Sequence, residues 1–185
     1  NNLIASGGTE TTCGNFKIHT FTGPGTFTVS QISGTAAENT VGYMVVAGGG
    51  GGGIVRAAGG GAGGFREGRN VPIDNFTASP LVANAPTNAV TVTATSYPIT
   101  VGAGGGAGAG ASCNTPAFVA ATPGSNSIFS TIISTGGGKG GMQVPGTPST
   151  DNGFPGGSGG GARYGPSTIG SGNTPPVTPS QGNNG

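Results

Sequence analysis

The chain has 185 residues, of which 43 are glycine and 14 are proline, and only 6% are charged. Its formal net charge is +1 at pH 7, so it lacks the clustered Lys and Arg side chains of a surface that binds nucleic acid. No apolar stretch approaches the ~20 residues that span a bilayer. We therefore expect neither a nucleic-acid partner nor insertion into a membrane.

Glycine and proline in this amount are typical of low-complexity, disordered segments. Disorder usually accompanies a high net charge and few β-branched residues, whereas Val, Ile, Thr and Phe are common outside the glycine runs of this chain. We therefore expect an ordered, mainly β fold. Gly or Pro interrupts every stretch with a helical period, which predicts no substantial α-helix.

Residues 1–47 are predicted to form a β-rich framework. Residues 14–34 read as a β-hairpin, in which 16–20 and 26–32 are paired strands and Gly23-Pro-Gly25 is the turn. His19 lies in the alternating part of this hairpin and is expected on the surface. Residues 41–47 are nearly all apolar, which predicts a strand that is buried on both faces.

Residues 48–170 are predicted to form a glycine-rich region, interleaved with strands at about 89–101 and 127–135. The first of these strands contains Pro98, which favours an edge or a bulge. A short strand is expected at 65–71 and a loop at 111–127. Three glycine runs, 48–53, 102–110 and 136–141, directly follow strand-like sequence.

Ordered glycine loses more backbone entropy than any other residue, and it has no side chain to bury, so only backbone contacts can offset this loss. A polyproline-II-type helix has three residues per turn and no internal hydrogen bonds. Its N–H and C=O groups can therefore bond to neighbouring helices that carry no Cβ. Collagen would require glycine at every third position, a silk-like stack fits only 106–111, and a flexible linker is the main alternative to packed polyglycine-II helices.

Residues 171–185 form a Pro/Gly/Asn-rich extension, and a flexible linker describes this stretch best. We expect the extension to continue in a longer protein.

No set of side chains predicts catalysis, metal binding or a cofactor. The chain has one histidine and five scattered carboxylates, and two cysteines with one histidine cannot supply a standard structural zinc site. We therefore expect a protein that is not an enzyme and has no cofactor. A disulfide between Cys13 and Cys113 would close a loop of about 100 residues, worth on the order of 4–5 kcal/mol; two unpaired thiols are the alternative.

The order of motifs resembles the glycine-rich domain family found in bacteriophage tail-fibre and receptor-binding (adhesin) proteins. The central motif is Val41-Gly-Tyr-Met-Val-Val-Ala47 followed by six glycines. Further similar stretches are 59–68, 97–105, 125–130, 156–162 and 181–185. The resemblance implies a jelly-roll-like β-sandwich framework with polyglycine-II helices packed against it. It also implies a virion component of the tail fibre or tip that serves host attachment through loops.

Several expectations follow from this resemblance. The large residues expected on loops are candidates for receptor contact: Phe118, Met142, Phe154, Arg163 and Tyr164. The partners would be a host cell-surface receptor, other virion tail proteins and further copies of the chain, with a trimer favoured. The alternative is a bacterial extracellular glycine-rich surface or ice-binding protein, which needs a regular row of Thr or Ala on one face.

Overall fold

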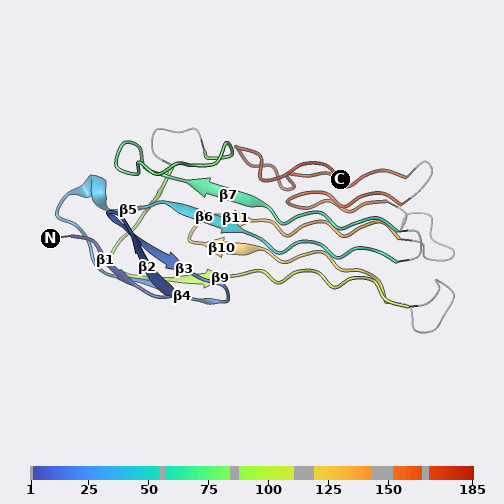
Figure 1. Cartoon of the computed structure of the whole chain (residues 1–185), viewed down its shortest axis with the longest axis horizontal. Coiled ribbons are helices and arrows are strands. Elements are labelled where there is room, and N and C mark those ends of the chain that lie inside the picture. The colour runs from blue at the N-terminus through green and yellow to red at the C-terminus, as the bar shows by residue number, and fades with distance from the viewer. Residues whose placement is uncertain (1, 55–56, 84–87, 111–118, 143–151, 164–166) are drawn as a thin grey trace.

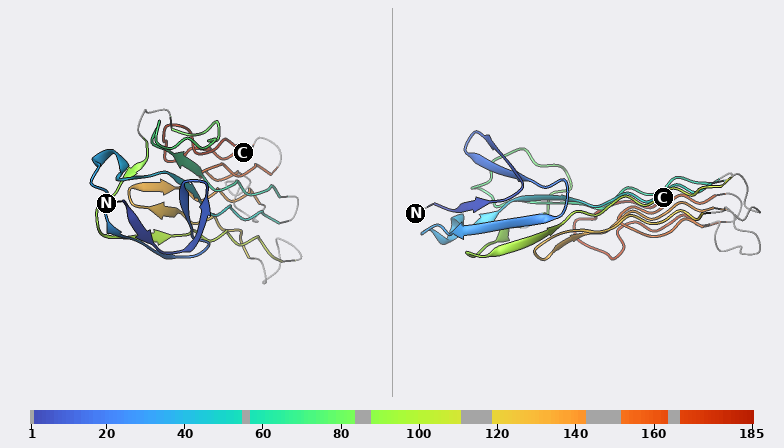
Figure 2. Two further views of the ribbon diagram at one scale, coloured as in Figure 1. Left: turned by 60° about the vertical axis from the view of Figure 1, so that its left-hand side comes forward. Right: turned by 90° about the horizontal axis from the view of Figure 1, so that it is seen from below.

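A computed structural model of the chain describes residues 2–54, 57–83, 88–110, 119–142, 152–163 and 167–185. It consists of a β framework, which holds all the strands, and a bundle of long, wavy segments that extends from one side of the framework (Figures 1 and 2). We call this bundle the lattice, and its members the lattice segments. The main lattice segments are 47–54, 57–64, 102–110, 119–126, 135–142, 152–163 and 167–185.

The described part of the chain is mainly β and contains no substantial α-helix, as the sequence predicts. The strands are β1 (Ile4–Ser6), β2 (Thr9–Cys13), β3 (Phe16–Thr20), β4 (Gly25–Gln31), β5 (Thr40–Val41), β6 (Tyr43–Val46), β7 (Phe65–Gly68), β8 (Val90–Thr91), β9 (Ser96–Thr100), β10 (Ser127–Phe129) and β11 (Ile132–Ser134). One short 3₁₀ turn, η1 (Ala36–Glu38), precedes β5. All strand pairs within the sheets are antiparallel.

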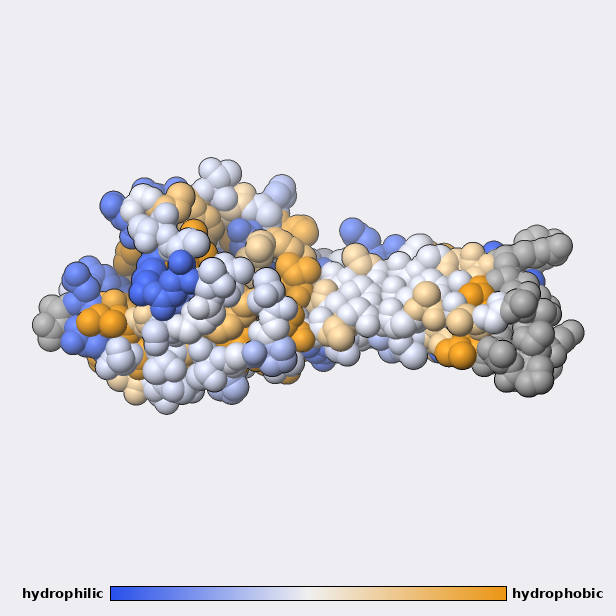
Figure 3. Space-filling view, turned by 60° about the horizontal axis from the view of Figure 1, so that its bottom comes forward, coloured by the Kyte–Doolittle hydropathy of each residue, from blue (hydrophilic) through white to orange (hydrophobic). Residues whose placement is uncertain are grey.

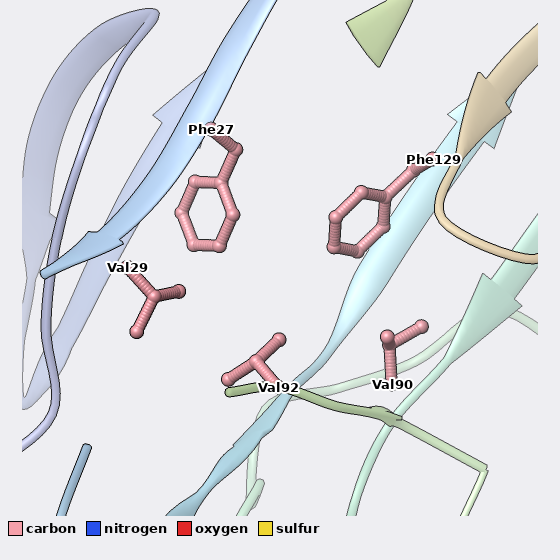
Figure 4. Packing of buried hydrophobic residues seen from close by; sticks show 5 residues of the cluster. All are labelled: Phe27, Val29, Val90, Val92 and Phe129. Carbon is pink, nitrogen blue, oxygen red and sulfur yellow. The ribbon is translucent and has the colours of Figure 1, made fainter. Parts of the chain in front are cut away.

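A hydrophobic core lies between two layers of the framework. One layer is a five-stranded sheet with the order β1-β4-β9-β10-β11, and the other contains the pairs β5–β8 and β6–β7. The buried residues of the core are Phe27, Val29, Val90, Val92 and Phe129 (Figure 4). The Phe27 and Phe129 rings meet edge to face with centroids 5.9 Å apart, the geometry that aromatic quadrupoles favour. This arrangement is the expected sandwich.

The predicted hairpin of 14–34 is wrong in its pairing, although both of its strands exist. β3 pairs with β2 around a turn at Gly14, which has φ of 57°. β4 instead pairs with β1 and β9. The apolar side chains Phe27 and Val29 place β4 in the core sheet, and β2 and β3 form a separate two-stranded ribbon.

β6 is not buried on both faces, which corrects the prediction for 41–47. Tyr43 and Val45 pack against the core, whereas Met44 and Val46 are 67% and 50% exposed. The reason is that β6 has the core on one side and no further layer on the other. The apolar run therefore alternates like a half-buried strand.

Two further predictions need correction. Residues 127–135 form the hairpin β10–β11 rather than one strand, because the chain turns at Ser130, which has φ of 53°. Pro98 lies in β9, an interior strand of the sheet and not an edge. It is tolerated there because the ladder between β9 and β10 ends at Ile99, opposite Phe129, one residue short of Pro98.

The lattice segments continue the strands without a break. β6 pairs with β7 up to Val46 opposite Phe65, and the next bond runs from the Ala47 N–H to the Gly64 carbonyl (3.0 Å). In the same way, β9 and β10 lead into the bond from the Ser125 N–H to the Ala103 carbonyl (2.9 Å). The framework therefore fixes which glycine lies beside which.

The backbone hydrogen bonds of the lattice repeat every third residue. The N–H groups of Ala47, Gly50 and Gly53 donate to segment 57–64, and those of Gly48 and Gly51 donate to segment 119–126. This repeat is that of a helix with three residues per turn and no internal bonds. It confirms the packed polyglycine-II helices that the sequence predicts.

The tight packing explains glycine at particular positions. A Cβ on Gly51 would overlap the carbonyl of Gly106, and a Cβ on Gly138 would overlap the carbonyl of Phe154. Any side chain at these positions would push two backbones apart. The lattice therefore depends on glycine where one segment faces another.

The lattice is larger than the sequence predicts. Segment 119–126, expected as a loop, bonds to 102–110 and 47–54 although it contains only one glycine. The extension 171–185 is no free linker, since Gly185 donates to Gly170, and Phe65 donates to the carbonyl of Gln181. The boundary at residue 170 therefore does not mark the end of the packed region.

Candidate functional site

The end of the lattice opposite the framework is the candidate functional site, because the chain reverses its direction there repeatedly. Described residues on either side of each reversal are 54 and 57, 110 and 119, 142 and 152, and 163 and 167 (Figure 1). The Ala109 and Val119 backbones exchange both hydrogen bonds, at 3.0 and 2.8 Å. These two bonds hold the start and end of the connection between residues 110 and 119 together.

The five residues predicted to contact a receptor do not share one kind of environment in the structure. Met142 is 2% exposed, so it is a packed residue and not a surface contact; it ends the buried segment 135–142. Phe154 and Arg163 are half-buried. Phe118 and Tyr164 lie outside the described residues, within two of the four connections.

Lys139 is a residue of this region that the sequence analysis did not single out. Its Nζ lies 4.3 Å from the centroid of the Phe154 ring, a cation–π contact. The Phe154 N–H also donates to the Lys139 carbonyl (3.1 Å). Phe154 therefore contacts the ammonium group of a lysine within the lattice, which favours a structural role of this aromatic side chain over contact with a receptor.

Cys13 is exposed at the end of β2 and carries a free thiol. Cys113 lies outside the described residues. The possible bridge between the two cysteines therefore stays a prediction. A shallow hollow beside Cys13 is lined by Asn15, Phe16, Asn75 and Phe76.

The titratable groups of the framework have structural roles. Lys17 donates a hydrogen bond to Glu10 across the β2–β3 ribbon, with Nζ 2.6 Å from Oε2, and this lowers the pKa of the Glu10 carboxyl. Burial against the core raises the pKa of Tyr43. The prediction that His19 lies on the surface is wrong. Its side chain is only 10% exposed, and its ring meets that of Phe27 edge to face with centroids 5.1 Å apart.

Neither a metal centre nor a membrane-spanning helix emerges from the described ranges. They contain no group of three or more His, Cys, Asp or Glu residues placed to hold a metal ion. They also contain no helix that is long and apolar enough to cross a bilayer.

The comparisons with known proteins agree with the fold. The family model of a glycine-rich domain matches residues 20–185, which covers the core sheet except β1 and the whole described lattice. No curated protein and no solved structure matches the chain. Since the model covers nine-tenths of the sequence, the chain belongs to the glycine-rich domain family.

Proposed function

We propose that this chain is a non-enzymatic structural component of a bacteriophage tail fibre or fibre tip, and that it serves attachment to the host surface. The lattice is the rigid scaffold in this proposal. The connections at its far end make the contact, and Phe118 and Tyr164 are the aromatic anchors.

The observation that carries the proposal is the separation of the two ends of the molecule. The β framework forms one end, and the described lattice segments before and after four connections extend to the other (Figure 2). Binding residues are often carried on loops that a rigid scaffold positions. A lattice made of backbone presents few side chains along its length, so recognition falls to the loops at its end.

The proposal also rests on the resemblance of the ordered motifs to tail-fibre adhesins, since fold alone does not specify function. It places the chain in the virion, beside other tail proteins and further copies of itself.

The test is binding of the fluorescently labelled chain to a panel of intact bacterial strains, measured by flow cytometry. We expect the parent chain to bind a subset of strains, and the double variant Phe118→Ala/Tyr164→Ala to lose at least about tenfold in affinity, as for removal of interface anchors. Thr11→Ala, on the exposed strand β2 at the other end, is the control and should bind like the parent. Binding that survives the double variant would contradict the proposal.

The ice-binding alternative makes a different prediction. It requires a regular row of Thr or Ala, whereas the outward positions of segment 47–54 are Gly49 and Gly52. Freezing hysteresis of the purified chain distinguishes the two functions, and a clear hysteresis gap would favour the alternative.

A further inference from the structure

One side of the lattice has unused bonding positions. A helix with three residues per turn carries three rows of N–H and three rows of C=O groups, and so has six bonding directions. Segment 47–54 uses four of them, toward 57–64, 135–142, 119–126 and 102–110. The described part of the chain leaves two directions open.

The two open directions lie next to each other. The four bonded neighbours form a continuous arc, because 57–64 bonds to 135–142, 135–142 bonds to 119–126, and 119–126 bonds to 102–110. In hexagonal packing, the ends of such an arc lie on opposite sides of the central helix. Segments 57–64, 47–54 and 102–110 therefore form a straight row. We call the outer side of this row the open lattice face.

Each open direction leads to a place where a further helix could pack, which we call an open position. Each open position is lined by hydrogen-bond donors from one segment and by acceptors from its neighbour. Between 47–54 and 102–110, the donors are the N–H groups of Gly49 and Gly52, and the acceptors are the carbonyls of Gly105 and Gly108. None of these four groups has a hydrogen-bond partner within the described ranges. Donors and acceptors both repeat every third residue, as a further polyglycine-II helix would require.

The second open position is lined by the same kinds of hydrogen-bonding groups. Between 47–54 and 57–64, the N–H groups of Gly60 and Gly63 face the carbonyls of Gly50 and Gly53. These four groups also have no hydrogen-bond partner in the part of the chain that the structure describes. The open lattice face is therefore complementary to itself.

Glycine occurs on this face at positions where the chain's own packing does not require it. A Cβ on Gly49 would lie 3.6 Å from the nearest atom, one on Gly52 3.7 Å and one on Gly104 3.8 Å. These distances are ordinary van der Waals contacts. The entropic cost of ordered glycine thus has no internal explanation here, whereas a backbone packed against the face from outside would require it.

We propose that the open lattice face is the surface through which two copies of this chain associate, with the glycine helices of one copy placed in the open positions of the other. A second copy is the occupant that fits, because its face supplies the matching rows of donors and acceptors. In the view of Figure 3 the middle of the lattice is mostly close to neutral in hydropathy. Segments 47–54, 57–64 and 102–110 contain no charged residue, so charge does not select another class of partner. This proposal does not depend on the attachment role.

The test is sedimentation velocity of the full chain from about 10 µM to about 1 mM, a range that reports weak association. We expect reversible dimers in the parent. Gly49→Ala/Gly52→Ala should raise the dissociation constant by roughly tenfold or more, because two methyl groups keep the facing backbones apart. The thermal midpoint at low protein concentration should not fall, since both Cβ atoms fit within one copy.

Gly106→Ala is the matched control, because its Cβ would lie 3.6 Å from Thr122 Oγ1, on the side that faces segment 119–126. It should dimerise like the parent. A parent that stays monomeric at all concentrations, or a double variant that dimerises as strongly as the parent, would overturn the proposal.

Amide exchange measured by NMR gives a readout that does not depend on substitution. The amides of Gly49 and Gly52 should exchange more slowly at high than at low protein concentration. Those of Gly48 and Gly51, which donate to Ser125 and Thr122 within one copy, should be protected at both. Equal exchange of Gly49 and Gly52 at both concentrations would contradict the proposed interface.

Discussion

At the scale of the residue, glycine is required where a Cβ would point at a neighbouring segment, whatever the length of the glycine run. Gly48 to Gly53 look identical in sequence, yet their Cβ positions meet different surroundings. The Cβ of Gly48 or Gly51 would overlap a carbonyl of segment 102–110, whereas that of Gly49 or Gly52 would not. Neighbouring glycines therefore make different contributions to stability.

Gly51→Ala and Gly52→Ala should separate these contributions. Gly51→Ala should destabilise the fold by about 1–3 kcal/mol, the usual range for overpacking, because its Cβ would overlap the Gly106 carbonyl. Gly52→Ala should be neutral or stabilise by up to about 1 kcal/mol, because alanine restricts the unfolded chain. Thermal unfolding at low protein concentration measures both. Equal losses in the two variants would contradict the directional argument.

At the scale of the element, the C-terminal segment is fastened to the junction of framework and lattice by Gln181. Its side chain is 2% exposed. Its Oε1 accepts from the Thr135 N–H (2.8 Å), its Nε2 donates to the Pro175 carbonyl (3.0 Å), and its own carbonyl accepts from the Phe65 N–H (2.9 Å). The side chain of Gln181 thus joins the start of segment 135–142 to the final turn of the chain, and its backbone carbonyl adds β7.

Gln181→Leu should release this segment. The substitution leaves the Thr135 N–H and the Pro175 carbonyl without partners, at about 1–3 kcal/mol for each buried group. We expect a lower thermal midpoint and faster hydrogen exchange across 167–185. Thr178→Ala, at an exposed position of the same segment, is the control and should change neither. Slow exchange across 167–185 in Gln181→Leu would show that the lattice bonds alone hold the segment.

The elements show what the sequence could predict and what it could not. Strand-like runs that lead into glycine predicted the packed helices, because both the apolar pattern and the missing side chains are local signals. Strand β2 was missed since Thr9–Cys13 has no large apolar residue, although Gly14-Asn15 before β3 is a hairpin signal. Segment 119–126 was also missed, because only Gly124 in it must face another backbone.

The candidate site was less predictable than the fold. Met142 reads as an exposed large residue next to a glycine run, but neighbouring segments bury it. The pairing of β4 with β9, which are far apart in sequence, also has no local signal. Contacts between distant segments decide both cases.

At the scale of the whole molecule, charged side chains contribute little to the fold, which depends on the hydrophobic core and on backbone hydrogen bonds. Charged residues make up only 6% of the chain. Among the described residues, the ion pair of Lys17 and Glu10 lies on the exposed β2–β3 ribbon, away from core and lattice. Surface pairs of this kind contribute little and are screened by salt.

Stability should therefore be insensitive to ionic strength. Between about 0.05 M and about 1 M NaCl, where the screening length falls several-fold, we expect little change in the thermal midpoint. Lys17→Ala should leave the midpoint close to that of the parent. A steep dependence of the parent on salt would show that electrostatic interactions hold the molecule together.

The continuity of strand and glycine helix also governs how such a molecule can change its length during evolution. Three added residues supply one complete turn, about 9 Å along the axis, and return every later group to its former orientation. Insertions of matched triplets into neighbouring segments would extend the reach of the tip and keep its pairing intact. Insertion of one or two residues would rotate all following groups away from their partners, so lengths should differ among relatives in steps of three.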